Sequence, residues 1–520
     1  MFQTQIMFDL AFGDASSTES SGSPQPQPID PNTITMRFSR LLISSLLFMT
    51  SAQAASYSPR KSRSDVIDCL TSHNFPFVGK NSPNWTSYAT PYNLRLVYEP
   101  AVITIPETPE HVSSSVTCAA AAGLKVQAKG GGHSYASYSS GGQDGSLIID
   151  MEKFASVERL GNVATKIFEQ GKRALPPGTC PGVGIAGHAL HGGYGYASRK
   201  WSITPDTIVG LDVVLANGSQ VHTTSERYPD VFYAMRGAGE SFGIVTYFYM
   251  QTQAAPSSVL YFAADLAVSL RDVETVTSGF EKLQNFSLTS PLLTPSITFG
   301  MYTDSNGIFS LSGWCMDCKI SLLRNTILPA MLAGFPGSVP TITPQSWIEA
   351  LTNLGVPQAM TQPLGHECSF HDTFYAKSLV MKNSRPLSTS AIRAFWSYML
   401  ANQGKAQFYS IIDLYGGSDS AINTPDQNSS AYSHRDALWV FQNYVHTANS
   451  QPPFDPALVQ LADGLNAAVE NAQANGDFMG YLNYVDSSLS AMTAAESYYG
   501  AETYNKLLGI KTELDPMFVF

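Results

Sequence analysis

Two glycine-rich segments constrain the fold of this chain more than any other feature. The first, Lys129–Tyr135, reads Lys-Gly-Gly-Gly-His-Ser-Tyr, and the second runs from Gly178 to Gly195. Glycine lacks a β-carbon, so it permits sharp turns and a close approach of the backbone to a flat or charged partner. Consecutive bare N–H groups also bind anions. We therefore expect two loops that together hold a large cofactor with a pyrophosphate group.

Each segment carries a candidate nucleophile, His133 in the first and Cys180 in the second. An imidazole and a thiolate can both form covalent bonds to a cofactor. Taken singly, each residue also fits a simpler assignment: His133 as an ordinary loop histidine, and Cys180 as a buried or disulfide-bonded cysteine. The combination of the two segments is what favours covalent attachment.

The common nucleotide-binding loops are not supported. Gly182–Gly187 matches the letters of the Gly-x-Gly-x-x-Gly fingerprint, but it follows Cys-Pro instead of the apolar strand that a Rossmann site requires. The chain also lacks the Gly-x-x-x-x-Gly-Lys-Ser/Thr motif of ATPase phosphate loops. A different kind of cofactor site is therefore expected.

Together the two segments resemble the flavin-attachment motifs of the berberine-bridge-enzyme-like oxidases, within the vanillyl-alcohol oxidase / p-cresol methylhydroxylase superfamily. The likeness is closest to the fungal glucooligosaccharide oxidases and extends from about Asp65 to the C-terminus. The resemblance implies FAD, bonded to His133 through the 8α-methyl group and to Cys180 through C6. It also implies an α+β fold, with a two-lobed FAD-binding domain and a substrate domain whose antiparallel sheet is backed by helices.

The resemblance assigns further residues to the FAD site. They are Gly130, Gly131, Gly132, Ser134, Gly184, Gly187, His188, Gly192, Gly193, Gly195, Ile244, Tyr481 and Asn483. It also places Cys69 and Cys118 at the positions of the family's disulfide.

Composition limits the classes of partner. A length of 520 residues predicts two or three domains, and an apolar content of 44% is enough for sizeable cores. Charged residues make up only 14% and the net charge is −11. Such a surface argues against nucleic acid or an anionic membrane as partner. The resemblance implies a small-molecule substrate instead.

The N-terminal region has the pattern of a secreted protein. Residues 1–35 are polar and are expected to be disordered. Residues 36–54 have a basic start, a short apolar run and a small-residue cleavage site, which is typical of a signal peptide. We expect Met36 to be the true start and 1–35 to be a gene-model artefact; a genuine leader ahead of an apolar helix is the alternative. No other apolar run reaches about 18 residues, so no membrane span is expected. Four glycosylation sequons, at Asn84, Asn217, Asn285 and Asn428, agree with secretion.

The hydrophobic pattern divides the rest of the chain into an FAD-binding domain (65–252), a substrate domain (253–480) and a C-terminal segment (481–520) that returns to the FAD-binding domain. In the first domain we expect strands at 101–106, 124–128, 146–150, 208–216, 220–223 and 244–250, and helices at 111–122 and 229–235. In the second, helices are expected at 271–284, 323–333 and 388–402.

One junction departs from the family pattern. In the family a strand and its glycine turn separate the equivalents of Leu160 and Gly161, which are adjacent here. A wrongly removed exon segment is the simplest explanation. A real deletion would weaken the fold and cofactor loading, because a lost strand removes both ladder partners and core packing.

Three cysteines remain in the substrate domain: Cys315, Cys318 and Cys368. Cys315 and Cys318 form a Cys-x-x-Cys pair without a second pair, which is too small a ligand set for zinc. We expect no metal and a disulfide among the three, with the pairing left open.

Three late segments, 408–413, 434–442 and 481–486, are predicted to be strands that face the substrate. With a period of two, Tyr409, Ile411 and Asp413 share one face. A carboxylate beside a tyrosine suits proton removal from a sugar hydroxyl, although the phenol, with an ordinary pKa near 10, needs a relay.

By resemblance, Tyr484 is the general base and Asp413 assists it. Gln442 and Tyr409 contact the sugar, and Tyr135 lies beside the reacting ring. Ile411 departs from the carbohydrate oxidases, which have Gln there, and a lost hydrogen-bond donor weakens a sugar subsite. Another departure concerns oxygen: Ile185 occupies the family's gate position, where valine accompanies oxygen access.

The resemblance therefore implies a secreted FAD-dependent oxidase that converts the anomeric hydroxyl of a mono- or oligosaccharide to a lactone and releases hydrogen peroxide from dioxygen. Two alternatives stay open. Ile411 and Phe441 favour a related oxidase or dehydrogenase for a secondary-metabolite alcohol. The gap after Leu160 favours a non-catalytic secreted protein that has lost its flavin.

Overall fold

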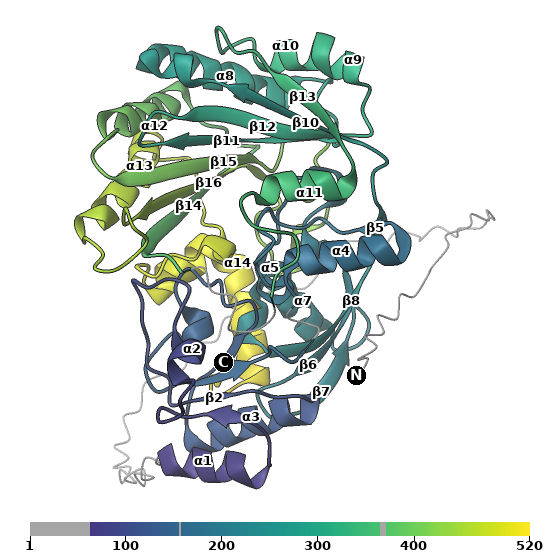
Figure 1. The fold of residues 1–520 in the computed structure, drawn as a ribbon, viewed down its shortest axis with the longest axis vertical. Helices are drawn as coiled ribbons and strands as arrows, with labels where there is room; N and C mark the ends of the chain where they lie inside the picture. Colours follow the sequence, from purple (N-terminus) through teal and green to yellow (C-terminus); the bar gives the residue numbers. More distant parts are fainter. Residues whose placement is uncertain (1–62, 155–157, 364–370) are drawn as a thin grey trace, which may run out of the picture. The chain divides into compact units, whose positions relative to one another are not determined.

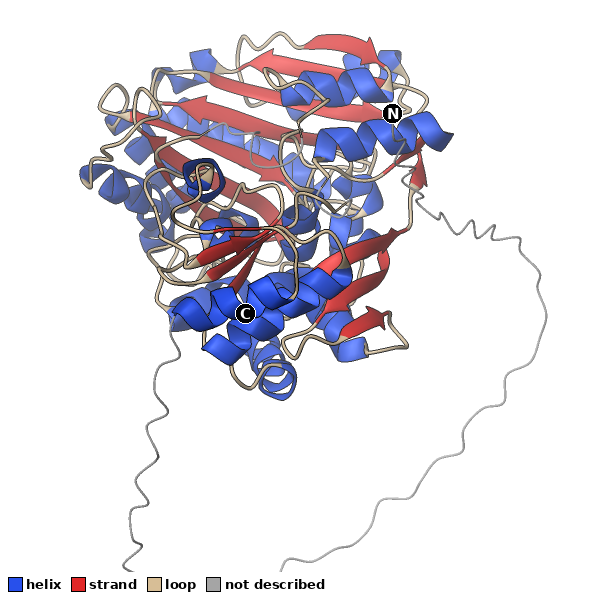
Figure 2. Cartoon of the chain, turned by 60° about the horizontal axis from the view of Figure 1, so that its bottom comes forward, coloured by secondary structure: helices blue, strands red, loops and turns tan. Residues whose placement is uncertain are grey.

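The computed structural model describes residues 63–154, 158–363 and 371–520 (Figure 1). The predicted leader and signal peptide, and Cys368, lie outside the described residues. The described part contains one large antiparallel sheet and three smaller sheets, which Figure 2 shows as separate groups of strands. The predicted mixed α+β class is confirmed.

The first small sheet carries the first glycine segment. Its order is β1-β2-β4-β3, with β2, β3 and β4 parallel and β1 antiparallel to β2. Every residue of β2 and β4 is buried, as expected for strands covered on both faces. The strands are β1 (Phe77–Val78), β2 (Val102–Thr104), β3 (Val126–Lys129) and β4 (Leu147–Asp150). Because β3 ends at Lys129, the glycine segment starts at the carboxyl edge of this sheet.

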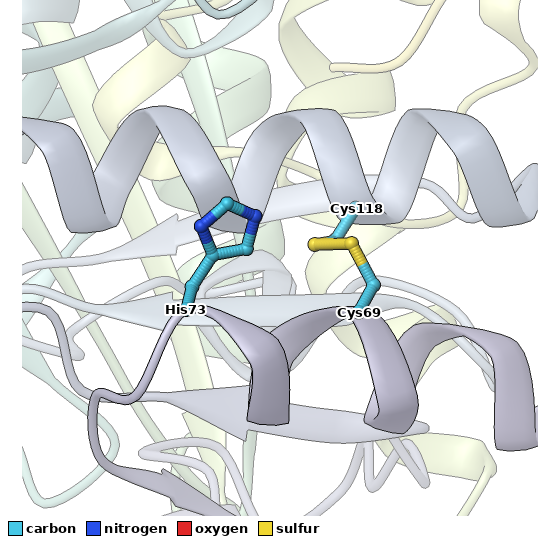
Figure 3. Close-up of side chains that lie close together, drawn as sticks. All are labelled: Cys69, His73 and Cys118. Atoms are coloured by element: carbon cyan, nitrogen blue, oxygen red, sulfur yellow. A yellow bond between two sulfur atoms is a disulfide. The ribbon is translucent and has the colours of Figure 1, made fainter.

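Two helices cover this sheet, α1 (Arg63–Ser72) and α3 (Pro109–Ala122). Thr108 caps α3 by accepting a hydrogen bond from the backbone of His111, and Gly123 ends it in a left-handed conformation. The disulfide Cys69–Cys118 joins the two helices, as the resemblance implied (Figure 3). His73 lies beside it, but both sulfurs are bonded to each other, so this group does not offer thiolate ligands to a metal.

A second part carries the other glycine segment. It holds a three-stranded sheet, β7-β6-β8, and a two-stranded one, β5-β9. The Asn217–Gly218 turn joins β6 to β7, and Gly218 has the positive φ that this turn requires. The elements are α4 (Leu160–Gly171), β5 (Arg173–Ala174), α5 (Ile185–His191), α6 (Ser198–Trp201), β6 (Ile208–Val214), β7 (Gln220–Thr223), α7 (Pro229–Ala238), β8 (Ile244–Met250) and β9 (Gln253–Ala254).

At the unusual junction, the chain pairs briefly with the second glycine segment. The backbone N–H of Leu160 donates to the carbonyl of Val183 at 2.8 Å, and that of Ile185 donates to Glu158 at 2.9 Å. Helix α4 then begins at Leu160. In the described residues the three-stranded sheet β7-β6-β8 and the two-stranded sheet β5-β9 are separate.

The large sheet has seven antiparallel strands in the order β13-β10-β12-β11-β15-β16-β14. Helices α8 (Val273–Thr289), α12 (Thr389–Ala401) and α13 (Ala457–Ala472) pack on its outer face (Figure 1) and form the largest apolar core with it. The strands are β10 (Val259–Asp265), β11 (Ile297–Asp304), β12 (Phe309–Met316), β13 (Thr341–Gln345), β14 (Phe374–Lys382), β15 (Gln407–Leu414) and β16 (Ala437–His446). A disulfide joins Cys315 to Cys318, which answers the pairing that the sequence left open.

Two predicted strands need correction. The strand predicted at 434–442 begins only at Ala437, so His434–Asp436 precede it. The strand predicted at 481–486 is a 3-10 turn, η9 (Leu482–Tyr484). The backbone N–H of Tyr481 donates to Ser378 Oγ at 2.7 Å, and that of Tyr484 donates back to the Tyr481 carbonyl. Tertiary contacts therefore overrode the alternating pattern.

The C-terminal helix α14 (Ala491–Leu514) is kinked at Gly500. Leu507 and Ile510 pack with α7 and β6 in one core, and the carbonyl of Val519 accepts a hydrogen bond from Val126 of β3. Over the ranges that are described, no helix combines the length and apolar character that crossing a bilayer requires.

Candidate active site

The two glycine segments lie in direct backbone contact. A β-carbon on Gly131 would collide with the backbone nitrogen of Gly184, and one on Gly184 would lie 2.5 Å from the nitrogen of Gly131. Neither position can carry a side chain without moving the other loop. Glycine at these two positions thus allows the two backbones to approach closely. One backbone continues to His133, and the other carries Cys180.

A buried arginine binds both segments. Arg159, which is 3% exposed, donates from Nη1 to the carbonyl of Gly131 and to that of Gly182, the second at 2.7 Å. Sequence reasoning missed this residue. Its signal was indirect: Arg159 stands next to the junction at Leu160, where the chain is drawn against the second glycine segment.

His133 lies on the first segment, against Tyr92, with ring centroids 4.6 Å apart. A β-carbon on Gly182 would lie 3.6 Å from His133 Nε2, so the imidazole reaches the second segment. Burial, and then electrostatic interactions with Arg159 and His371, lower the pKa of His133 to about 3. The imidazole is therefore neutral at physiological pH, the form that has a nucleophilic nitrogen.

Cys180 is the one described cysteine outside a disulfide, and it is solvent-accessible. Protein nevertheless surrounds the site, so desolvation raises the pKa of the thiol, with a smaller opposing effect from Thr179. Because the sulfur is exposed and not in a disulfide, it is available to a ligand.

Most of the other predicted cofactor residues belong to the same two glycine segments. Gly130, Gly132 and Ser134 flank the first contact, and Ser134 Oγ accepts a hydrogen bond from the backbone of Tyr138 at 3.0 Å. In the second segment, β-carbons would collide with the Tyr481 ring at Gly192, with Thr204 at Gly193 and with the Pro177 carbonyl at Gly195, whereas Gly187 has open space. Ile244 is the buried first residue of β8.

Tyr481 and Asn483 hold the second segment from the η9 turn. With its amide oriented to satisfy both ends, Asn483 donates to the carbonyl of Gly187 at 3.2 Å and accepts from the backbone of Gly193 at 3.1 Å. The Tyr481 hydroxyl accepts from Tyr194. His188 is buried with Nε2 unpaired, and burial lowers its pKa to about 4.

The predicted substrate residues come together on the inner face of the large sheet. In the β15–β16 register Ile411 pairs with Gln442, and Tyr409 with Tyr444. Gln442 Nε2 donates to the hydroxyl of Tyr135 at 2.7 Å, which links this sheet to the first glycine segment.

Tyr135 in turn stacks on Tyr484, with ring centroids 5.7 Å apart. The predicted trio of Gln442, Tyr135 and Tyr484 therefore forms one continuous group, built from β16, the first glycine loop and η9.

An aromatic wall continues from this group through the predicted Tyr409 to Tyr444 and Phe374, two residues that sequence reasoning missed. Tyr409 stacks on Tyr444 at 4.8 Å, and Tyr444 stacks on Phe374 at 4.4 Å. The Tyr444 hydroxyl donates to Asp372 Oδ2 at 2.7 Å. Aromatic residues in β14 and β16 were the available signal, but the pairing of the two strands could not be read from the sequence.

Asp413 lies in a buried position on the same face. Its carboxylate occupies the space above Gly300 of β11, where a β-carbon would collide with Oδ1. Burial raises the pKa of Asp413 to about 7. Burial also raises the pKa of Tyr484 well above its ordinary value, and the negative charge of Asp413 adds to this shift. The site thus combines a carboxyl that titrates near neutrality with a phenol that stays protonated.

A separate cavity of ≈ 890 Å³ lies behind the η9 turn. Its lining includes Ser378, His434, Asn466, Gly480 and Tyr498 but none of the predicted substrate contacts. The chemistry of the chain is therefore not concentrated in this cavity.

The residues around His133 and Cys180 fit the flavin that the sequence resemblance implies. A neutral imidazole and an accessible thiol stand on two loops whose glycines leave the backbone bare. These features suit a flat ring system with a phosphate-bearing tail.

Comparison with known families agrees. A model described as an FAD binding domain matches residues 100–167 and 158–224, and a model described as berberine and berberine-like matches residues 480–520. The two parts of the first match overlap at residues 158–167, which include the unusual junction.

Known relatives align along most of the chain. A chitooligosaccharide oxidase of Gibberella zeae is 36% identical, with 88% of this chain and 93% of the relative covered. A xylooligosaccharide oxidase of Thermothelomyces thermophilus is 34% identical, with 91% and 96% covered, and a glucooligosaccharide oxidase of Sarocladium strictum is 30% identical, with 88% and 93% covered.

Solved structures show the same fold. The glucooligosaccharide oxidase of Acremonium strictum superposes with a TM-score of 0.81 at 29% identity, over 88% of this chain and 97% of the other. A xylooligosaccharide oxidase from Myceliophthora thermophila in complex with xylobiose gives 0.81 at 32% identity, over 88% and 98%. A further structure of the Acremonium protein is described as containing 6-S-cysteinyl, 8α-N1-histidyl FAD.

Proposed function

The chain belongs to the FAD-linked oxidases of the berberine-bridge type, and on that premise we propose that it oxidises the anomeric hydroxyl of a mono- or oligosaccharide to a lactone. Membership of this family makes it an FAD-binding oxidoreductase that acts on CH–OH donors. The choice of a sugar rests on relatives that are named as oligosaccharide oxidases and on the arrangement of the inner sheet face.

One observation supports the proposal most directly: the hydrogen bond from Gln442 to Tyr135. It joins the sheet face that carries Tyr409 and Asp413 to the loop that carries His133. A sugar held by Gln442 and Tyr409 would therefore lie next to the flavin site, beside the Tyr135 ring. Aromatic faces and amide groups together are typical of sites that bind small polar molecules in a fixed orientation.

FAD would be held by the bare backbone of both glycine segments, by Ile244, Tyr481 and Asn483, and by covalent bonds to His133 and Cys180. Each covalent bond would replace one hydrogen on the side chain and one on the flavin carbon. The two electrons and two protons released per bond would reduce one dioxygen to hydrogen peroxide. The chemistry that FAD supplies when bound is two-electron acceptance from the anomeric carbon and reoxidation by dioxygen, again with release of hydrogen peroxide.

Proton transfer falls to Tyr484 and Asp413. Because burial raises the pKa of Tyr484, its phenol does not ionise alone near neutral pH. The Asp413 carboxyl, with a pKa of about 7, is the group that can accept a proton in that range. Tyr484 takes the proton of the anomeric hydroxyl while the Asp413 carboxylate accepts the proton that the phenol gives up.

A secondary-metabolite alcohol is the second candidate substrate. Ile411 pairs with Gln442 at the centre of the inner face and offers an apolar surface where a sugar subsite would use a hydrogen-bond donor.

The proposed function also includes secretion, on the basis of residues 36–54 and the four sequons. It includes the use of dioxygen too, although Ile185 fills the expected gate position.

Purified protein tests these assignments. We expect a yellow colour that survives denaturation, and peroxide release with oligosaccharides. Activity on a matched panel of phenolic and alkaloid alcohols, without activity on sugars, would favour the second candidate. Colourless folded protein would instead indicate a chain that has lost its flavin.

A further inference from the structure

Arg159 is placed where it can control the spacing of the two proposed attachment residues. Its Nη1 donates to the carbonyl of Gly131, two residues before His133, and to the carbonyl of Gly182, two residues after Cys180. In each loop, a single residue separates the carbonyl that accepts this hydrogen bond from the nucleophile. A single nitrogen thus joins both loops close to the atoms that would bond the flavin.

We propose that Arg159 is a positioning residue for flavin attachment: it sets the distance between the His133 and Cys180 loops, so that one flavin can bond to both. This inference rests on the proposed double attachment. Two bonds to a single rigid ring require both nucleophiles to be held in register at once, whereas either single bond tolerates movement of the other loop.

The surroundings of Arg159 support a fixed position. Its side chain is buried, and a β-carbon on Gly131 would lie 2.9 Å from Nη1, so guanidinium and loop are in contact. A buried guanidinium is costly unless it is hydrogen-bonded, and here backbone carbonyls of both loops provide acceptors. Movement of either loop would break one of these bonds inside the protein.

The charge of Arg159 has a second consequence for His133. After burial, Arg159 is the next contributor that lowers the pKa of this imidazole, so it helps to keep the nucleophilic nitrogen free of a proton. The hydrogen bonds of Arg159 and its charge therefore both favour bond formation between His133 and the flavin.

Arg199 provides a matched control. It is also fully buried and donates to backbone carbonyls, to Gly416 at 2.9 Å and to Ser418 at 2.8 Å, but those acceptors lie in the substrate domain. Arg199→Met should lower thermal stability without separating the two attachment loops. A comparison of the two variants therefore distinguishes loop spacing from general loss of stability.

The test measures how flavin is attached in purified, folded, flavin-containing protein. Mass spectrometry of a digest gives the ratio of doubly attached flavin, on both the His133 and Cys180 peptides, to singly attached flavin. In Arg159→Met we expect this ratio to fall at least about tenfold relative to the native chain, which corresponds to about 1.4 kcal/mol of lost positioning. Arg159→Lys retains a cation that can donate to carbonyls and should restore more than half of the doubly attached fraction. Arg199→Met should leave the ratio unchanged while its melting temperature falls.

A native-like ratio in Arg159→Met would overturn the inference, and so would an equal fall in Arg199→Met. If Arg159→Met is insoluble, Arg159→Gln, which can still donate to one carbonyl, takes its place with the same expectation. Unmodified His133 and Cys180 peptides in the native chain would instead show that the proposed double attachment is wrong, and the role of Arg159 would be rejected with it.

Discussion

Burial is the main cause of the pKa shifts of individual residues in this site. It lowers the pKa of His133 to about 3, raises that of Asp413 to about 7 and raises that of Tyr484 further above its ordinary value. Each shift favours the neutral form of the group. Of the three, only the carboxyl of Asp413 is thereby placed to change charge near physiological pH.

The pH dependence of turnover should report Asp413. Its raised pKa means that the carboxyl is protonated below about pH 7 and can accept a proton only above it. We therefore expect kcat/KM to rise with pH through about 7, and Asp413→Asn, which cannot ionise, to lower kcat/KM and remove this rise. Steady-state peroxide release between pH 5 and 9 measures it. Asp372→Asn, a change of another carboxylate near the same sheet face, is the control and should keep the rise. An unchanged profile in Asp413→Asn would contradict the assignment.

Removal of the Tyr484 hydroxyl should stop turnover without loss of cofactor. Tyr484→Phe keeps the ring that stacks on Tyr135 but removes the proton-transfer group. General acid–base groups contribute about 10²–10⁴-fold, so kcat should fall by a factor in that range. Flavin absorbance and kcat are measured on the same sample, with Tyr498→Phe as a control hydroxyl deletion outside the site. Full activity of Tyr484→Phe with bound flavin would refute its role.

At the scale of elements, local sequence predicted what local forces determine. The strands around β2, β4, β6 and β8 and the helix α3 appear close to their expected bounds, because runs of apolar residues define the strands, and a Thr108 cap and a Gly123 stop define the helix. Predictions failed where partners are distant in sequence. The 481–486 segment alternates like a strand, yet Ser378 holds its backbone in a turn, and Arg159, Tyr92 and Tyr444 join the site only through tertiary pairing.

The two disulfides should differ in what they contribute. Cys69–Cys118 spans a sequence separation of 49, whereas Cys315–Cys318 spans 3. Loop-closure entropy predicts about 4 kcal/mol for the first and about 2 kcal/mol for the second. Each pair has one buried and one half-buried cysteine, so loss of packing is similar. Double Cys→Ala variants of each pair, compared by thermal unfolding, should therefore show the larger fall in melting temperature for Cys69/Cys118. Equal falls would indicate that local strain or packing, and not loop length, dominates.

At the scale of the whole molecule, buried arginines join the substrate sheet to the flavin-binding part. Arg199 of α6 reaches the carbonyls of Gly416 and Ser418 beyond β15. Arg435, just before β16, makes a two-pronged ion pair with Asp206, with both N···O distances at 2.7 Å. Since the site takes Tyr135 and His133 from one part and Gln442 and Asp413 from the other, these contacts hold the two halves of the site in register.

Breaking the Arg435–Asp206 pair should separate the unfolding of the two parts. The Arg435 and Asp206 side chains are 4% and 12% exposed, so Arg435→Met leaves a buried carboxylate without its cation, a change that costs about 3–5 kcal/mol. Asp206→Asn in the same chain removes that charge and should recover much of the loss, so the two changes will not be additive. Far-UV circular dichroism follows the whole fold and flavin fluorescence follows the site. The two melting curves should coincide in the native chain and diverge in Arg435→Met, because the flavin-binding part would lose its partner before it unfolds. A double variant as unstable as the sum of its single variants would show that the ion pair does not couple the two parts.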